Sequence, residues 1–217
     1  QSMLSLLGED FTIDRIDRLR DGLDQLERHT RDLQESVMLI RMLPISFAFN
    51  RFPRMVHDLS LKLGKKIELN MSGENTEVDK TVIEKIGDPL VHLIRNSLDH
   101  GIELPQERAA AGKPETGSIE LNAEHKGGNI IIEVRDDGKG LVAEHILEKA
   151  IEQEVASTDQ VLSDQQVYEL IFQPGFSTVN TVSEVSGRGV GMDVVRRNIN
   201  ELGGSIGIDS EEGVGTA

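Results

Sequence analysis

The stretch NIIIEVRDDGKG, residues 129–140, carries most of the information about the fold. Apolar and polar residues alternate up to Asp136, a pattern typical of a half-buried strand. Residues 118–125 alternate in the same way and lead into it across Lys126-Gly127-Gly128, which predicts a β-hairpin. The hairpin ends at Asp136-Asp137-Gly138-Lys139-Gly140, which is either an ordinary turn or a ligand-binding turn. In the second case the glycines would let a ligand approach the backbone, and a buried Asp would accept a hydrogen bond from an exocyclic amine.

Helices and strands on both sides of the hairpin predict an α+β fold, a two-layer α/β sandwich with a mixed sheet. Residues 66–71 and 205–209 read as strands, and residues 79–99, 106–111, 143–153, 163–172 and 191–202 read as helices.

The predicted helix over residues 79–99 carries a polar face beside its apolar one. His92, Asn96 and the pair Asp99-His100 follow one another at helical spacing. Such a face contacts either water or a ligand. The carbonyl oxygen of Asn96 is a hard ligand suited to Mg²⁺, which commonly takes a few protein oxygens together with substrate phosphates.

A third cluster is Gly187-Arg188-Gly189-Val190-Gly191-Met192, which opens the last predicted helix. Backbone N–H groups at a helix N-terminus form an anion site, so phosphates are the expected ligand. The loop is not a dinucleotide fingerprint, because no strand directly precedes it, and it is not a Walker loop, because no Gly-Lys-Ser/Thr follows. The preceding tract from Phe172 to Ser186 has the composition of a mobile lid with aromatic anchors.

The first 45 residues have a different pattern. From Ile16 to Ile40 apolar residues recur at steps of three and four, which is the period of a bundle or coiled-coil seam. The helix either lies on its own domain or needs a second helix, and we favour the second. We expect residues 1–45 to form a helical hairpin, shortened at its front, that dimerises as a four-helix bundle. Pro44 should end or kink the helix near Leu43.

Composition narrows the class of protein. The 217 residues include 23 Lys and Arg against 38 Asp and Glu, a formal charge of -15. Residues 1–66 hold 11 basic and 10 acidic side chains, so the excess belongs to residues 67–217, which argues against nucleic acid as a partner. The absence of cysteine excludes disulfides and thiolate metal sites. No apolar run or signal-peptide pattern suggests membrane insertion, so we expect a cytoplasmic protein.

The order of these motifs is more specific than any one of them. An Asn-bearing helix, Asp-x-Gly-x-Gly after a strand, a phenylalanine pair, Gly-x-Gly-x-Gly opening a helix, and Gly213-Val214-Gly215-Thr216 follow one another. This series resembles the ATP-binding module shared by histidine kinases, gyrase-type topoisomerases, heat-shock chaperones and mismatch-repair ATPases. Four segments narrow it to the chemotaxis histidine kinases: RMLP at 41–44, DPLVHLIRNSLDHGIELP at 88–105, FQPGFST at 172–178 and VSGRGVGMDVVRRNI at 185–199.

The resemblance implies a role for each matching residue. Asn96 would hold Mg²⁺, Asp136 would receive the adenine amine, and Gly138 and Gly140 would shape that wall. His92 stands where the ATP-hydrolysing relatives place a Glu, which fits a kinase. We expect His92 and His100 to assist phosphate positioning or proton movement. Together with the cation Arg95 and the motif residues near the phosphates, the expected nucleotide-binding set is Arg95, Asn96, Asp136, Gly138, Gly140, Ser177, Thr178, Gly187, Arg188, Gly189, Val190, Gly191, Met192 and Thr216.

The resemblance also implies domains and partners. We expect a dimerisation hairpin over residues 1–45 and a catalytic ATP-binding domain over residues 46–217, with its last strand missing. The chain would bind Mg-ATP and transfer the γ-phosphate to a histidine on a separate phosphoacceptor domain, in signal transduction to a response regulator. It would dimerise through its N-terminal helices and join membrane-associated receptor and coupling-protein arrays through regions beyond this chain. An ATPase clamp and a non-enzymatic dimerisation scaffold are the alternatives.

Overall fold

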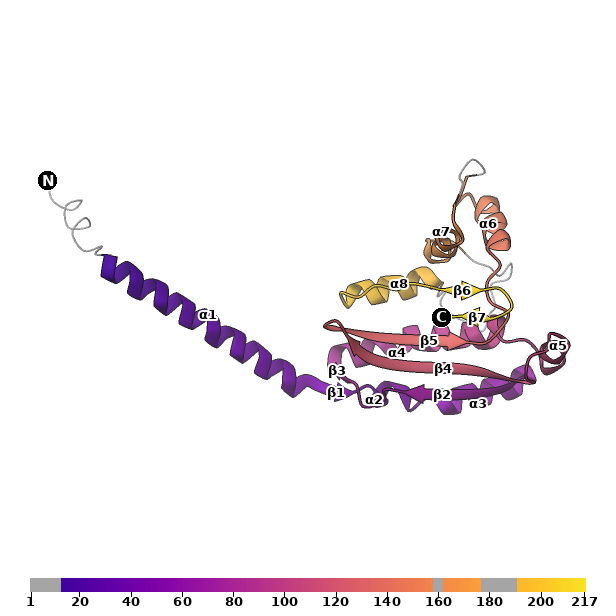
Figure 1. Ribbon diagram of the computed structural model, residues 1–217, viewed down its shortest axis with the longest axis horizontal. Coiled ribbons are helices and arrows are strands. Elements are labelled where there is room, and N and C mark those ends of the chain that lie inside the picture. The colour runs from indigo at the N-terminus through magenta and orange to yellow at the C-terminus, as the bar shows by residue number, and fades with distance from the viewer. Residues whose placement is uncertain (1–12, 158–161, 177–190) are drawn as a thin grey trace. The chain divides into compact units, whose positions relative to one another are not determined.

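The computed structural model describes residues 13–157, 162–176 and 191–217 (Figure 1). The chain divides into two compact units, residues 1–42 and 43–217. The helices of the second unit are α2 (Ser46–Phe49), α3 (Phe52–Leu63), α4 (Lys80–Asn96), α5 (Pro105–Ala110), α6 (Ala143–Glu152), α7 (Asp164–Glu169) and α8 (Met192–Glu201). The strands are β1 (Met42–Pro44), which begins at the last residue of the first unit, and β2 (Lys66–Ser72), β3 (Glu77–Asp79), β4 (Thr116–Lys126), β5 (Asn129–Asp136), β6 (Ser210–Glu211) and β7 (Gly215–Thr216) of the second.

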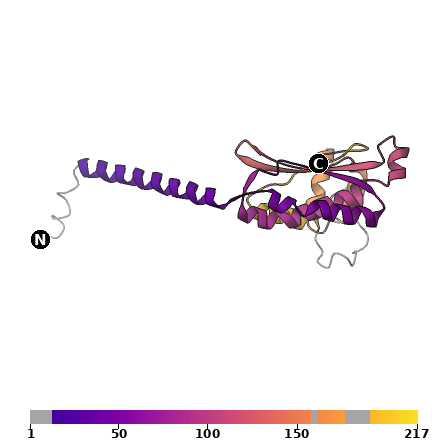
Figure 2. The same cartoon turned by 90° about the horizontal axis from the view of Figure 1, so that it is seen from below.

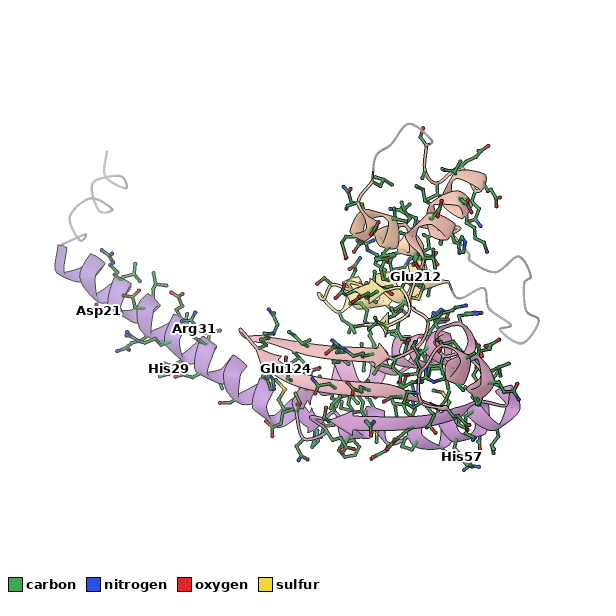
Figure 3. All side chains as sticks on the ribbon, turned by 45° about the vertical axis from the view of Figure 1, so that its right-hand side comes forward. Asp21, His29, Arg31, His57, Glu124 and Glu212 are labelled. Carbon is green, nitrogen blue, oxygen red and sulfur yellow. The ribbon has the colours of Figure 1, made fainter. Side chains whose placement is uncertain are left out.

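From residue 13 onward, where the structure describes it, the first unit consists of helix α1 (Ile13–Arg41), which ends before Pro44 as predicted. Its outer faces are charged, and Figure 3 shows Asp21, His29 and Arg31 projecting from the helix. The seam leucines are left exposed, at 57–67% of their surface: Leu19, Leu23, Leu26 and Leu33. The predicted hairpin is not seen as such, because its first half falls in residues 1–12, outside the described residues.

The second unit has a five-stranded mixed sheet in the order β2-β4-β5-β7-β6. Strand β2 runs parallel to β4, and the other neighbours are antiparallel, with Ile119 of β4 opposite Asp136 of β5. The mixed sheet and its central hairpin are therefore confirmed. Helices α3, α4 and α8 lie together on one side of this sheet, which gives the α+β sandwich two layers (Figure 2).

The core lies between the sheet and the long helix α4. The sheet contributes alternate residues such as Ile119 and Leu121, because successive side chains of a strand point to opposite faces. Helix α4 contributes Ile86, Leu90 and Ile94 at helical spacing. The helix begins at Asp79 as predicted, where the carboxylate caps the backbone N–H of Thr81 at 2.7 Å.

Two sequence expectations need correction. Residues 205–209 do not form the expected strand: β6 is Ser210–Glu211, and of the expected segment Asp209 alone exchanges backbone hydrogen bonds with Ala217, directly after the neighbouring strand. Helix α3 was not predicted at all, although Pro53 at its start and Gly64 at its end, with φ of 66°, are its local signals. Among the described residues, no helix has both the length and the apolar character needed to cross a membrane.

Candidate functional site

Asp136 is the centre of the candidate site, and the strand pattern places it. Ile130, Ile132 and Val134 alternate along β5 on the face that packs against the core, and Asp136 is the next residue in that series. Its side chain is only 6% exposed. A carboxylate so buried needs hydrogen-bond donors or a ligand.

The donors come from three segments around the end of β5. Oδ1 of Asp136 accepts from the backbone N–H of Gly138 at 3.1 Å. The side chain of Ser97 and the backbone of Thr216 also hydrogen-bond the carboxylate. Burial nevertheless outweighs them and raises the pKa of Asp136 above its ordinary value, with the neighbouring charge of Asp137 adding to the rise. The group is thus an acceptor held in a poorly solvated position, where one more donor would stabilise it strongly.

Glycines allow the backbone to pack closely around this carboxylate. A Cβ atom added to Gly101 would lie 3.0 Å from Oδ2 of Asp136. Added to Gly138, Gly140 or Gly215, it would overlap backbone atoms of Gly101, Glu211 or Asp136. The predicted Asp-x-Gly-x-Gly turn is therefore packed backbone against backbone, which only glycine allows.

Ser97 and Gly101 were missed by the sequence reasoning. A short π-helix, Ser97–Gly101, follows α4 directly and brings both residues against Asp136. Single π-helical turns are frequent at functional sites. The one sequence signal for Ser97 and Gly101 is the glycine directly after the polar cluster, within the segment 88–105 that resembles the chemotaxis histidine kinases.

Asn96 lies at the junction of α4 and α8. Its amide nitrogen donates to Sδ of Met192 at 3.2 Å, so the end of α4 meets the first residue of α8. Gly191 is the N-cap of that helix, and a Cβ there would approach Oδ1 of Asp193 to 2.5 Å. The structure thus brings three predicted residues, Asn96, Gly191 and Met192, to the N-terminal end of α8, where a helix favours anions.

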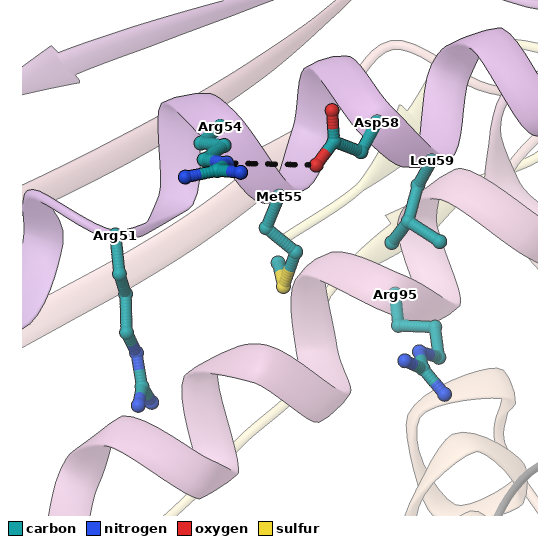
Figure 4. Close-up of a pocket in the computed structure, with 6 residues that line it drawn as sticks. All are labelled: Arg51, Arg54, Met55, Asp58, Leu59 and Arg95. Atoms are coloured by element: carbon teal, nitrogen blue, oxygen red, sulfur yellow. Dashed lines mark ion pairs between the residues drawn. The ribbon is translucent and has the colours of Figure 1, made fainter.

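Of the other predicted cations and histidines, His92 and Arg95 lie on α4 just before Asn96, and His100 follows on the π-helix. Arg95 lines an open groove of about 350 Å³ between α3 and α4, with Arg51, Arg54, Met55, Asp58 and Leu59 (Figure 4). Burial and the charge of Arg95 lower the pKa of His92, so this imidazole is neutral at physiological pH. His100 is exposed on the π-helix.

Thr216 is in β7 opposite Asp136, and its hydroxyl lies 3.0 Å from that of Ser210. The remaining predicted nucleotide-binding residues, Ser177, Thr178, Gly187, Arg188, Gly189 and Val190, lie outside the described residues, as does most of the predicted lid. At the start of that lid, Phe172 and Phe176 are both buried, and Phe172 packs under the guanidinium of Arg196 at 5.5 Å. Phe172 and Arg196 also line a second groove, of about 650 Å³.

In the part of the chain that the structure describes, no three His, Cys, Asp or Glu side chains gather as a metal site. A divalent ion held by protein carboxylates is therefore not indicated there. A Mg²⁺ ion held by one amide oxygen and by ligand phosphates fits the arrangement around Asn96.

Residues 85–217 match the family described as histidine kinase-, DNA gyrase B- and HSP90-like ATPases. The chain is 59% identical over 199 residues, 92% of its length, to the chemotaxis protein CheA of Klebsiella aerogenes. It is 55% identical over its whole length to CheA of Salmonella typhimurium. It covers 30% and 32% of those two proteins, so it spans about a third of their length.

A solved structure shows the same fold. The catalytic domain of the histidine kinase ThkA, in a nucleotide-free form, aligns with a TM-score of 0.51 over 81% of this chain and 89% of its own. The two sequences are only 17% identical, so this likeness concerns the fold alone.

Proposed function

This chain belongs to the histidine kinase-, DNA gyrase B- and HSP90-like ATPases, and we propose that it is the ATP-binding core of a chemotaxis histidine kinase. The observation that carries the proposal is the buried carboxylate of Asp136, framed by glycines at the end of β5. The identity of 55–59% to CheA proteins over nearly the whole chain supports the chemotaxis assignment.

Adenine recognition follows from the chemistry of Asp136. An ionised carboxylate only accepts hydrogen bonds, and the amino group at C6 of adenine only donates them. This hydrogen bond is favourable because the carboxylate of Asp136 is already buried and gains a donor when adenine binds. The glycines around it let the backbone segments pack closely, which holds the carboxylate at the end of β5.

Phosphate binding would use the N-terminal end of α8 and Asn96. Backbone N–H groups there face the phosphates, and the amide oxygen of Asn96 would hold Mg²⁺ against them. When bound, the ion neutralises charge that develops on the phosphates during transfer. Positioning is then the main task of the protein's own residues.

The proposed reaction is transfer of the γ-phosphoryl group to an imidazole nitrogen of a phosphoacceptor domain. A phosphorus–nitrogen bond forms, the bond from the γ-phosphorus to the β–γ bridging oxygen breaks, and ADP leaves. The unprotonated imidazole nitrogen attacks, and the proton of the other ring nitrogen passes to solvent. His92 lies one helical turn before Asn96 and is neutral, so it can accept a hydrogen bond from a group near the phosphates. A carboxylate at that position would instead activate water for ATP hydrolysis, which is the reaction of the alternative function, an ATPase clamp.

We propose a second copy of this chain as a further partner. The leucines of α1 form a stripe with the seam period and are 57–67% exposed. A second copy of the helix pair would cover this stripe, because apolar surface of that extent favours burial.

The deciding experiment mixes this chain with a separate domain that carries an acceptor histidine, in the presence of radiolabelled ATP and Mg²⁺. Sedimentation first establishes a concentration at which the chain is dimeric. We expect acid-labile label on the acceptor domain that is absent without this chain. Steady ATP hydrolysis that the acceptor domain does not affect would instead identify an ATPase.

Removal of Mg²⁺ should weaken ATP binding steeply. The second unit carries the excess of acidic residues, so its average charge repels a polyanionic nucleotide. Binding must therefore depend on local groups and on the metal, and we expect the Kd for ATP to rise at least tenfold when EDTA is added. Calorimetry with ADP and adenosine provides the comparison, since adenosine carries no phosphate and its affinity should not change. Equal ATP affinity with and without the metal would contradict the role given to Asn96.

A further inference from the structure

The second unit buries a complete guanidinium group outside the nucleotide contacts described so far. Arg108 in α5 is 0% exposed, which is unusual for arginine. Nε donates to the carbonyl oxygen of Pro114 at 2.7 Å, and Nη1 donates to Oε2 of Glu103 at 3.1 Å. The remaining bonds go to one residue, Asp137: Nη1 to its carbonyl oxygen at 3.1 Å and Nη2 to Oδ2 at 2.8 Å.

A second cation holds the same turn from the same direction. Nζ of Lys113 donates to the carbonyl oxygens of Asp137 at 3.0 Å and Gly138 at 2.6 Å, and to Oε1 of Glu103 at 3.1 Å. The other oxygen of the Asp137 carboxylate, Oδ1, accepts from the backbone N–H of Ser118 at 2.9 Å. The two residues that follow Asp136 are thus fixed by two cations and a strand.

Burying these charged groups costs free energy, so the arrangement contributes little to the stability of the domain. Taking charges out of water opposes their mutual attraction, and buried ion pairs are often no more stabilising than apolar side chains of the same shape. Ion pairs on the surface of the same domain, such as Lys66–Glu115, have side chains about 60% exposed and avoid this cost. In this network the guanidinium of Arg108 is fully buried, whereas the side chain of Asp137 is 41% exposed. The cost of desolvation therefore falls mainly on Arg108, whose bonds hold a turn in place.

What it holds in place is the carboxylate of Asp136. Oδ1 of Asp136 is bonded to the N–H of Gly138, so movement of the turn moves the carboxylate. Arg108 also pairs with the carboxylate of Asp137 at 2.8 Å, while Lys113 bonds the carbonyl oxygens of Asp137 and Gly138, so both ends of the turn are held.

We propose that Arg108 and Lys113 are positioning residues that set the base selectivity of the nucleotide site. They fix the turn Asp136–Gly138 and thereby hold the acceptor oxygens of Asp136 in place, so that the site prefers a 6-aminopurine over a 6-oxopurine. The inference rests on the proposed function, in which Asp136 receives the amino group of adenine. ATP and inosine triphosphate differ in that group, a donor in the first and an acceptor in the second, and share the triphosphate and ribose.

The test compares the Kd values of ATP and inosine triphosphate by calorimetry for wild type, Arg108→Met, Lys113→Met and Arg108→Lys. We expect each methionine variant to lose about tenfold in ATP affinity while inosine triphosphate changes less than twofold, so that the ratio of the two falls about tenfold. Arg108→Lys should recover part of the ratio, because it keeps the charge without the planar fork. If Arg108→Met does not fold by circular dichroism, Lys113→Met decides, because Lys113 is 18% exposed and its loss leaves a smaller gap.

Arg135→Met is the matched control. Arg135 immediately precedes Asp136 and pairs with Glu133 at 2.8 Å, but its side chain is 58% exposed. The ratio should not change in this variant. Equal weakening of both nucleotides in Arg108→Met and Lys113→Met, or no change in either, would overturn the inference while leaving ATP binding intact. Absence of ATP binding by the wild type would overturn the proposed function itself.

Discussion

Replacing Asp136 by alanine should reduce ATP affinity by about 30- to 150-fold, equivalent to about 2–3 kcal/mol, because one charge-assisted hydrogen bond to the base is lost. The carboxylate is 6% exposed, so water cannot take its place easily. Calorimetric titration with Mg-ATP at a concentration near the wild-type Kd measures the change. The phosphate contacts around Asn96 remain, so weak binding should persist rather than vanish.

Asp58→Ala is the control for this experiment. Asp58 is a surface carboxylate of α3 that lies 3.8 Å from Nε of Arg54, and its removal should leave ATP affinity unchanged. Circular dichroism establishes that both variants are folded. Asp136→Ala with wild-type affinity would show that the adenine is bound elsewhere and would remove the observation on which the proposed function depends.

The same carboxylate predicts the acid limit of binding. Burial raises the folded-state pKa of Asp136, so the group takes up a proton at a higher pH than an ordinary aspartate. Only the ionised form accepts from adenine, and ATP affinity should therefore fall as the pH is lowered through this raised pKa. The sign is opposite for the stability of the nucleotide-free chain. The favourable contribution of protonated Asp136 is present below the ordinary pKa and is lost as the pH rises through the raised one.

Part of this site follows from the sequence by simple periodicity. Ile130, Ile132 and Val134 point to the core, and strand alternation requires Asp136 to do the same. A carboxylate at the buried position of an apolar series is an exception that function explains best. The hairpin, the helix that carries Asn96 and the helix after the glycine loop were predictable for the same reason, since each has a long, regular apolar pattern.

The rest depends on contacts between distant segments, which periodicity does not contain. Ser97 and Gly101 reach Asp136 only because the chain leaves α4 through a π-helix. The burial of Arg108 was also beyond prediction, because a charged residue on a short helix flanked by Gly- and Pro-rich segments suggests a solvated side chain. Strand β6 was misplaced because the two-residue pairing with β7 is too short to impose an alternating pattern.

The close contact between the Asp136 turn and the π-helix gives the second large effect. In Gly138→Ala, the added Cβ atom would overlap the carbonyl group of Gly101 and lie 2.8 Å from the N–H nitrogen of Ile102. These are all backbone atoms, so no side-chain rotation relieves the overlap and the turn must move away from the π-helix.

The movement would disturb the hydrogen bond from the N–H of Gly138 to Asp136 and the bond of 3.0 Å from the N–H of Lys139 to the Gly101 carbonyl. We expect Gly138→Ala to destabilise the domain by about 1–3 kcal/mol in urea unfolding, the usual range for overpacking, and to lower ATP affinity at least tenfold.

Gly207→Ala separates this effect from a general intolerance of glycine replacement. A Cβ atom at Gly207 has no neighbour within 4 Å, so the change should stay within about 0.5 kcal/mol in stability and leave ATP binding as it is. If Gly138→Ala bound ATP as tightly as Gly207→Ala does, the turn could shift without consequence, and the geometry of Asp136 relative to the π-helix would not be what holds the base. The expected result is weak binding in the first variant and normal binding in the second. It would show that nucleotide affinity depends on the backbone contact between Gly138 and the π-helix as well as on the side chains of the site.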